Sequence, residues 1–114
     1  MIVWASFDPV TGKEQAGRRP ALVISSDAYL SLVTDLVIVM PVTSRNRGWD
    51  NHVVVAPSDM LGKPSWIMTE QIRALSRQRI HQVVGSVTDE CLSRVLLILR
   101  YLTEPLSVSP STQG

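Results

Sequence analysis

The sequence predicts a mainly β fold, a small and strongly curved antiparallel barrel with one C-terminal helix packed on it. Short segments rich in β-branched residues, separated by turn residues, fill the chain up to Val87. One segment with apolar residues at helical spacing then follows, from Thr88 to about Leu102. Many short strands before a single terminal helix are typical of such a barrel. With 114 residues, the chain is expected to form one domain.

The expected strands are bounded by turn residues. The first strand ends where Asp8-Pro9 interrupts the apolar run. Segment 35–42 is apolar on both faces, which predicts a central strand, and Pro41 predicts a missing ladder bond near its end. A turn or short helical piece is expected at 27–31 and a bulge at Gly85. The expected strands are 2–7, 21–26, 35–42, 52–55, 65–69, 70–75 and 78–87.

The expected helix begins with a capping residue. Thr88 can accept a hydrogen bond from the first turn, and Asp89 and Glu90 suit the positive end of the helix dipole. Cys91 lies on the apolar face and is therefore expected in the core. That face comprises Cys91, Leu92, Val95, Leu96, Leu99 and Leu102.

Composition excludes several classes of protein. A net charge of +1 excludes a polycation, but nine of the eleven basic residues are arginine, which permits a local positive groove. The single cysteine excludes an intrachain disulfide, and the sequence has no CxxC zinc motif. We find neither a signal peptide nor an apolar run long enough for a membrane, so a soluble cytoplasmic protein without metal or cofactor is expected. The expected organisation is a domain over 1–104 and a disordered Ser/Pro-rich tail over 105–114.

The most informative segment is a polar loop that runs directly into a strand, residues 12–25. Pro20 disfavours the α conformation for Arg19, so Arg19 is expected to leave the loop extended and to be anchored by the strand that follows. A guanidinium held in this way suits phosphate, because its planar fork binds two oxygens. An ordinary surface ion pair is the alternative role for Arg19. Glu14, five residues earlier, is a candidate proton acceptor in the same pocket.

Four segments resemble the MazF/PemK (Kid) toxins. The loop and strand read Gly12-x-Glu14-Gln15-x-Gly17-x-Arg19-Pro20-Ala21-Leu22-Val23-Ile24-Ser25, which is similar to the signature of that family. The other three segments are Val3–Pro9, Val39–Ser44, and Glu70–Leu75 followed by Arg79-Ile80. Four matches in the order and spacing of the family make the resemblance specific. It covers residues 2–102.

The resemblance implies a homodimeric SH3-like barrel of the PemK-like kind. It also implies the toxin half of a type II toxin–antitoxin pair, an mRNA interferase that cleaves single-stranded RNA at specific sequences. An unstructured segment of a MazE-like antitoxin would wrap the dimer and block its active site.

The chemistry that the resemblance implies uses the nucleophile of RNA itself. The 2′-OH attacks the adjacent phosphate and leaves a 2′,3′-cyclic phosphate and a 5′-OH, without a metal. Such a reaction needs a base, charge stabilisation and a proton for the leaving oxygen. By the resemblance, Arg19 stabilises the phosphate and Thr43 donates its hydroxyl hydrogen to a phosphate oxygen. Glu14 is the candidate base; a strand-end role for Thr43 and a solvated loop acid at Glu14 are the alternatives.

Further polar and aromatic residues are expected to bind RNA. Arg45 and Arg47 are expected to contact backbone phosphates, which governs the salt dependence of binding. Trp49 either stacks on an unpaired base or packs against the protein. His52 and His81 share no motif and are expected to be structural or exposed. The complete expected RNA-binding set is Gln15, Arg18, Ser44, Arg45, Arg47, Trp49, Gln71 and Arg73.

Two other functions are open to a chain of this kind. CcdB toxins resemble this fold and inhibit DNA gyrase by binding, through residues at the end of the terminal helix. The corresponding segment here, Leu99–Glu104, does not resemble theirs. A barrel without catalytic activity that only binds a partner is the third alternative. Replacement of Arg19 distinguishes RNA cleavage from gyrase inhibition, because it should abolish toxicity in the first case and leave it largely intact in the second.

Overall fold

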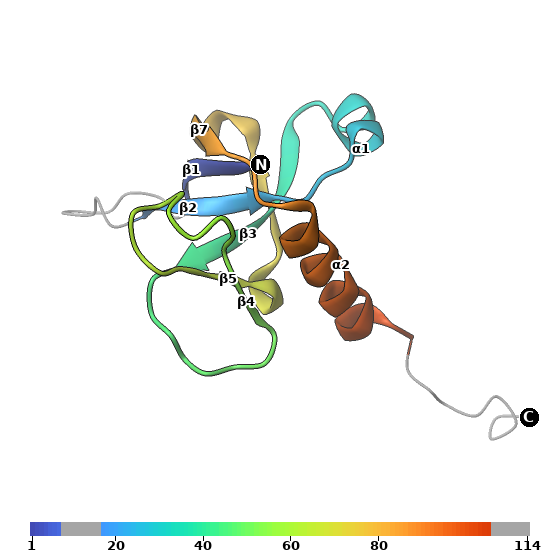
Figure 1. Cartoon of the computed structure of the whole chain (residues 1–114). Coiled ribbons are helices and arrows are strands. Elements are labelled where there is room, and N and C mark those ends of the chain that lie inside the picture. The colour runs from blue at the N-terminus through green and yellow to red at the C-terminus, as the bar shows by residue number, and fades with distance from the viewer. Residues whose placement is uncertain (8–16, 106–114) are drawn as a thin grey trace, which may run out of the picture.

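The computed structural model describes residues 1–7 and 17–105, which form one curved antiparallel sheet with helix α2 packed beside it (Figure 1). The strands are β1 (Ile2–Ser6), β2 (Arg18–Val23), β3 (Leu36–Thr43), β4 (His52–Val54), β5 (Trp66–Met68), β6 (Arg73–Ser76) and β7 (Ile80–Gly85). The described helices are α1 (Asp27–Leu32) and α2 (Asp89–Thr103), with 3-10 turns η1 (Thr69–Gln71) and η2 (Arg77–Arg79). The mainly β fold with a C-terminal helix is therefore confirmed.

Strand β3 is the centre of the sheet. The order is β4-β5-β3-β2-β1-β7, and β6 pairs with β3 as well. On one side of β3, β6 pairs with residues 36–39 and β5 pairs with Val42 and Thr43. Pro41 lies between these two partners, so the donor that proline lacks is not needed there. The predicted central position and the predicted gap in the ladder at Pro41 are both confirmed.

The central strands are apolar because both of their faces are buried. Side chains alternate between the two faces of a strand, so Ile2 and Leu22 enter one core cluster while Val3 and Ala21 enter the other. The first cluster is closed by α2 and the second includes Phe7 and Leu75. Burial on both faces fixes the register of these strands, because a slip of one residue would exchange the two sets.

Helix α2 begins as its sequence predicts. The side chain of Thr88 accepts a hydrogen bond from the backbone N–H of Cys91, and Asp89 and Glu90 occupy the first turn. Cys91 and Val95 are buried against the sheet, so the core position predicted for Cys91 is confirmed. Within the described residues, no helix is both long enough and apolar enough to cross a membrane.

The structure corrects several details of the predicted barrel. The sheet is open among the described residues, because its end strands β4 and β7 do not pair with each other. The strand predicted at 70–75 begins only at Arg73, since the 3-10 turn η1 precedes it. The strand predicted at 78–87 begins at Ile80, after the turn η2, and ends at Gly85. The bulge expected at Gly85 occurs beside it, where β1 and β7 shift register between Ile2 and Val3.

Truncation of a leucine in the first core cluster should cost stability according to its burial. Leu22→Ala should lower the free energy of unfolding by about 2–5 kcal/mol, because it leaves a cavity in a site with no exposed surface. Leu32→Ala makes the same chemical change at a side chain that is 82% exposed and should change it by less than about 0.5 kcal/mol. Urea titration followed by circular dichroism measures both, and equal effects would contradict the assigned core.

Candidate active site

A cleft opens where strands β2 and β3 separate. The two strands pair from Val23 and Val39 to Ala21 and Pro41 and are not paired beyond that point, while the other edge of β3 pairs with β5 at Val42 and Thr43. The space between the separated ends is a cleft of about 570 Å³. Its lining residues are Trp4, Arg18, Arg19, Pro20, Val42, Thr43, Ser44, Arg45, Arg47, Leu61, Lys63 and Ser65.

The register of β2 and β3 brings Arg19 and Thr43 to opposite walls of this cleft. Each lies two residues beyond the last pair, Ala21 and Pro41. Because side chains two residues apart share a face of a strand, Arg19 and Thr43 lie on the same face. Both line the cleft. The structure therefore brings together the two residues that the sequence motif selects for phosphate stabilisation.

The cleft is strongly cationic. Its lining contains Arg18, Arg19, Arg45, Arg47 and Lys63, and no Asp or Glu of residues 1–7 and 17–105 belongs to it. Among the described residues, none of these five side chains forms an ion pair, since the pair that the structure records joins His52 and Glu70 elsewhere. Concentrated positive charge in a concave surface attracts anions. Phosphate is therefore the ligand chemistry that this surface fits best.

The hydroxyl of Thr43 is oriented by its neighbour. The backbone N–H of Arg45 donates a hydrogen bond to Oγ1 of Thr43, at 3.1 Å. Since a hydroxyl both donates and accepts, this contact uses a lone pair and leaves the hydroxyl hydrogen for another acceptor. A half-buried threonine at the end of β3 can thus donate to a phosphate oxygen in the cleft. The exposed Ser44 beside it also lines the cleft.

The other predicted site residues lie apart from the cleft or outside the described part of the chain. Glu14 and Gln15 belong to residues 8–16, outside the described residues. Trp49 packs on His52, with ring centroids 4.9 Å apart. Gln71 lies in η1, and the guanidinium of Arg73 lies 5.7 Å from the centre of the Phe7 ring. Their roles in RNA binding stay predictions.

Sequence reasoning did not select Lys63, Trp4 or Ser65 for the cleft. Lys63 follows Gly62, whose φ of 77° is left-handed, in the segment that leads into β5. A turn glycine beside a lysine is too common to predict a site. Trp4 pairs with Pro20 across β1 and β2, so its place in the cleft depends on a strand pairing that no local signal encodes.

Comparison with protein families identifies the chain. The family model described as "PemK-like, MazF-like toxin of type II toxin-antitoxin system" matches residues 1–103. The chain belongs to this family. The resemblance carried by the Arg19 loop and the three other segments is therefore confirmed.

Individual members of the PemK-like, MazF-like family are similar over most of their length. The endoribonuclease toxin MazF of Escherichia coli K12 is 30% identical over 95 residues, which cover 82% of each chain. The crystal structure of MazF from Deinococcus radiodurans has a TM-score of 0.71 at 36% identity and covers 89% of this chain and 90% of that one. A MazE–MazF structure from the same organism has a TM-score of 0.70 at 30% identity, with 92% of each chain covered.

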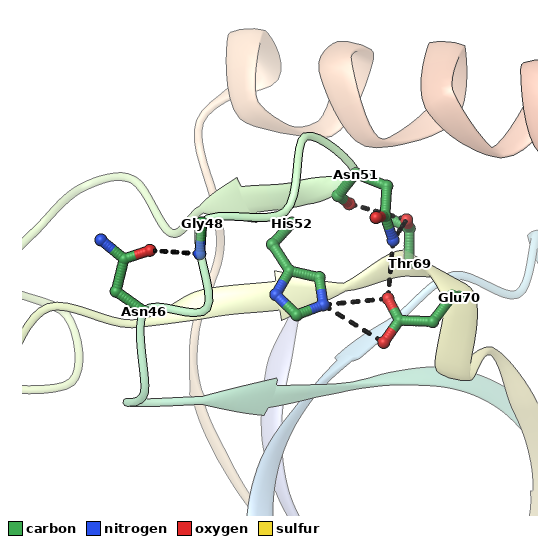
Figure 2. Close-up of polar contacts among 6 residues, drawn as sticks. All are labelled: Asn46, Gly48, Asn51, His52, Thr69 and Glu70. Atoms are coloured by element: carbon green, nitrogen blue, oxygen red, sulfur yellow. Dashed lines mark hydrogen bonds and ion pairs between the residues drawn. The ribbon is translucent and has the colours of Figure 1, made fainter.

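A second polar cluster of this chain, formed by Asn51, His52, Thr69 and Glu70, lies beside the loop that carries Arg45 and Arg47 (Figure 2). Nε2 of His52 lies 3.0 and 3.2 Å from the two carboxylate oxygens of Glu70. Because an ionised carboxylate only accepts hydrogen bonds, Nε2 carries the hydrogen. The His52 side chain is 2% exposed and that of Glu70 is 28% exposed.

Hydrogen bonding sets the charge state of Glu70. Burial acts to raise the pKa of its carboxyl, but the hydrogen bonds from His52, from its own backbone and from Asn51 outweigh burial and hold the pKa below the ordinary value of 4.5. Glu70 is therefore ionised at neutral pH. Among residues 1–7 and 17–105, no three side chains of His, Cys, Asp or Glu gather where they could hold one metal ion.

Loss of the Glu70 charge should destabilise the chain at neutral pH and less so in acid. The pKa of Glu70 is lower in the folded than in the unfolded chain, so its stabilising effect is complete above 4.5 and disappears as the pH falls through the folded value. Glu70→Gln should thus differ from the parent in urea titrations at neutral pH and approach it in acid. Asp50→Asn is the control, because the Asp50 carboxylate has no hydrogen bond among the described residues. A difference for Glu70→Gln that does not shrink in acid would contradict this account.

Proposed function

We propose that this chain is the toxin of a type II toxin–antitoxin system that acts as a metal-independent, sequence-specific endoribonuclease on single-stranded mRNA in the cytoplasm. One observation carries the chemical part of the proposal. Arg19 and Thr43 line opposite strand ends of a cationic cleft that no described carboxylate lines. Membership in the PemK-like, MazF-like toxin family gives the biological setting, and the similar MazF of Escherichia coli is named an endoribonuclease.

The reaction is an internal transesterification of RNA. The 2′-oxygen attacks the neighbouring phosphorus while its proton leaves to a base. The bond from phosphorus to the 5′-oxygen breaks, and the leaving 5′-oxygen takes up a proton from water. The products are a 2′,3′-cyclic phosphate and a 5′-OH. Arg19 stabilises the negative charge that grows on the non-bridging oxygens, and the hydroxyl of Thr43 donates to one of them. Glu14 is the proposed base, from the sequence alone.

The remaining cations of the cleft position the RNA backbone. Arg18, Arg45, Arg47 and Lys63 line it beside the reacting pair. Phosphate contacts of this kind hold a nucleic acid in register but carry little information on its sequence. Sequence specificity therefore depends on base contacts, for which Trp49 offers an exposed ring at the end of the same loop.

A MazE-like antitoxin is the proposed inhibitor. A related MazF from Deinococcus radiodurans has been solved together with MazE. A cleft built to attract phosphates also attracts acidic side chains. An extended antitoxin segment that fills the cleft would exclude RNA from Arg19 and Thr43.

A homodimer is the proposed assembly, with the toxin domain over residues 1–104 and a tail over 105–114. Val54, Leu97 and Tyr101 are exposed apolar side chains on β4 and α2. Val54 and Leu97 also line a groove of about 590 Å³. Contiguous exposed apolar surface of this kind marks an interaction site, which a second copy of the chain would cover.

Replacement of Arg19 should abolish RNA cleavage. Arg19→Ala should lower kcat at least about 100-fold, because it removes a charged donor aimed at the phosphate. The purified chain is incubated with a long single-stranded RNA in EDTA, and the ends are mapped. We expect cuts at a short recurring sequence with 5′-OH termini. Arg100→Ala is the matched control, since Arg100 lies on α2 and outside the cleft lining.

Each outcome of this experiment decides between functions. Cleavage by the parent and by Arg100→Ala, but not by Arg19→Ala, supports the endoribonuclease. If a folded, antitoxin-free parent leaves RNA intact but arrests growth, a gyrase inhibitor of the CcdB kind replaces it. Intact RNA and normal growth would indicate a binding protein without catalytic activity.

Removal of Arg45 or Arg47 should weaken RNA binding more than chemistry. For each RNA phosphate that is no longer neutralised, the slope of log K against log salt should fall in magnitude by about 0.7 for a single strand. Binding of a noncleavable single-stranded oligonucleotide, with deoxyribose at the cut position, is measured by fluorescence anisotropy at several salt concentrations. An unchanged slope in both variants would exclude these arginines from phosphate binding.

A further inference from the structure

Residues 44–51 form a loop between the cleft and the second polar cluster. The loop begins after Thr43, at the end of β3, and ends at His52, the first residue of β4. Arg45 and Arg47 on this loop line the cleft. Its middle is a tight turn, in which Oδ1 of Asn46 accepts from the N–H of Gly48 at 2.9 Å, and Gly48 has a left-handed φ of 73°. The loop therefore connects the cationic wall of the cleft to His52.

Glu70 binds the C-terminal end of this loop, at Asn51 and His52 (Figure 2). Nδ2 of Asn51 donates to Oε1 of Glu70 at 2.7 Å and to Oγ1 of Thr69 at 3.1 Å. The hydroxyl of Thr69 donates in return to the backbone carbonyl of Asn51 at 2.7 Å. With the contact to His52, the Glu70 carboxylate receives hydrogen bonds from two consecutive residues of the chain. Such charge-assisted bonds are stronger than neutral ones.

A series of stacked groups leads from this cluster back toward the cleft. The Trp49 ring lies against the buried His52 ring, with centroids 4.9 Å apart and planes at 42°. The guanidinium of Arg47 lies 5.8 Å from the centre of the Trp49 ring, within range of a cation–π attraction. The orientation of Arg47 thus depends on Trp49, and that of Trp49 depends on His52.

We propose that Glu70 is a positioning residue, which acts through Asn51 and His52 to hold the 44–51 loop so that Arg45 and Arg47 face the cleft. Glu70 does not line the cleft itself. The effect of this positioning on RNA rests on the proposed endoribonuclease function, whereas its effect on the loop does not.

A loop that is already ordered before RNA binds would increase the affinity for RNA. All residues from Ser44 to Asp50 are exposed, so few apolar contacts hold this part of the chain. Fixing the backbone of one residue costs about 1–2 kcal/mol of conformational entropy. If the cluster around Glu70 orders the loop when the chain folds, this entropy is lost before RNA binds, and it does not weaken the affinity for RNA. Loss of the cluster should therefore raise KM and leave kcat almost unchanged.

The test compares Glu70→Ala, Asn51→Ala and the double variant with Asp50→Ala. Asp50 is the matched control, because it is an exposed acid on the same loop whose carboxylate has no hydrogen bond among the described residues. Hydrogen exchange of the peptide that covers 44–51, measured by mass spectrometry, should be faster in the three cluster variants than in the parent. KM for RNA should rise roughly tenfold in them, the effect of removing one charge-assisted hydrogen bond. Because the Asn51–Glu70 hydrogen bond is lost in either single variant, the effect of the double variant should be smaller than the sum of the two single effects.

Different failures of this experiment are distinguishable. Unchanged loop exchange in Glu70→Ala, with a folded core, would overturn the positioning role whether or not the chain cleaves RNA. A large fall in kcat with KM and loop exchange unchanged would also overturn it, because Glu70 would then act in the chemistry. Faster loop exchange in a chain that never cleaves RNA would support the positioning of the loop and reject the proposed endoribonuclease instead.

Discussion

The separation of β2 and β3 beyond Ala21 and Pro41 is the constraint on which the rest of the site depends. Strand β3 exchanges partners there, from β6 on one side of Pro41 to β5 on the other. Proline supplies no backbone donor, so the exchange leaves no N–H unpaired at that residue. Were the ladder of β2 and β3 to continue, Arg19 and Thr43 would be sheet neighbours. Because it stops, they border an open cleft instead.

The cleft combines a rigid wall with an adaptable one. Arg19 extends from a strand that Ala21 and Leu22, which follow Pro20, anchor by full burial in different core clusters. Arg45 and Arg47 extend from an exposed loop that side-chain contacts must hold. Catalytic groups on a scaffold strand and binding groups on a loop are a common division in enzymes. With the proposed roles, the loop could differ among RNA specificities while Arg19 and Thr43 keep their positions.

The sequence predicted the structural features that depend on neighbouring residues of the chain. The burial of β3 on both faces, the Thr88 cap and the extended Arg19 before Pro20 follow from residues next to one another in the chain. The starts of β6 and β7 did not, because 3-10 turns replace the first residues of the two predicted strands. The contact of His52 with Glu70 spans 18 residues and follows only from the pairing of β4 with β5. Thr43 was predicted through the family motif, since a threonine at a strand end is otherwise ordinary.

The crowding of positive charge in the cleft affects the free chain as well as its complexes. Arg18, Arg19, Arg45, Arg47 and Lys63 repel one another across a concave surface that no described carboxylate lines. A polyanion that occupies the cleft removes this repulsion and binds the folded state alone, so it raises the melting temperature by mass action. Inhibitor and RNA would then compete for the same cationic cleft. The toxin released from its inhibitor would have a lower melting temperature than the complex.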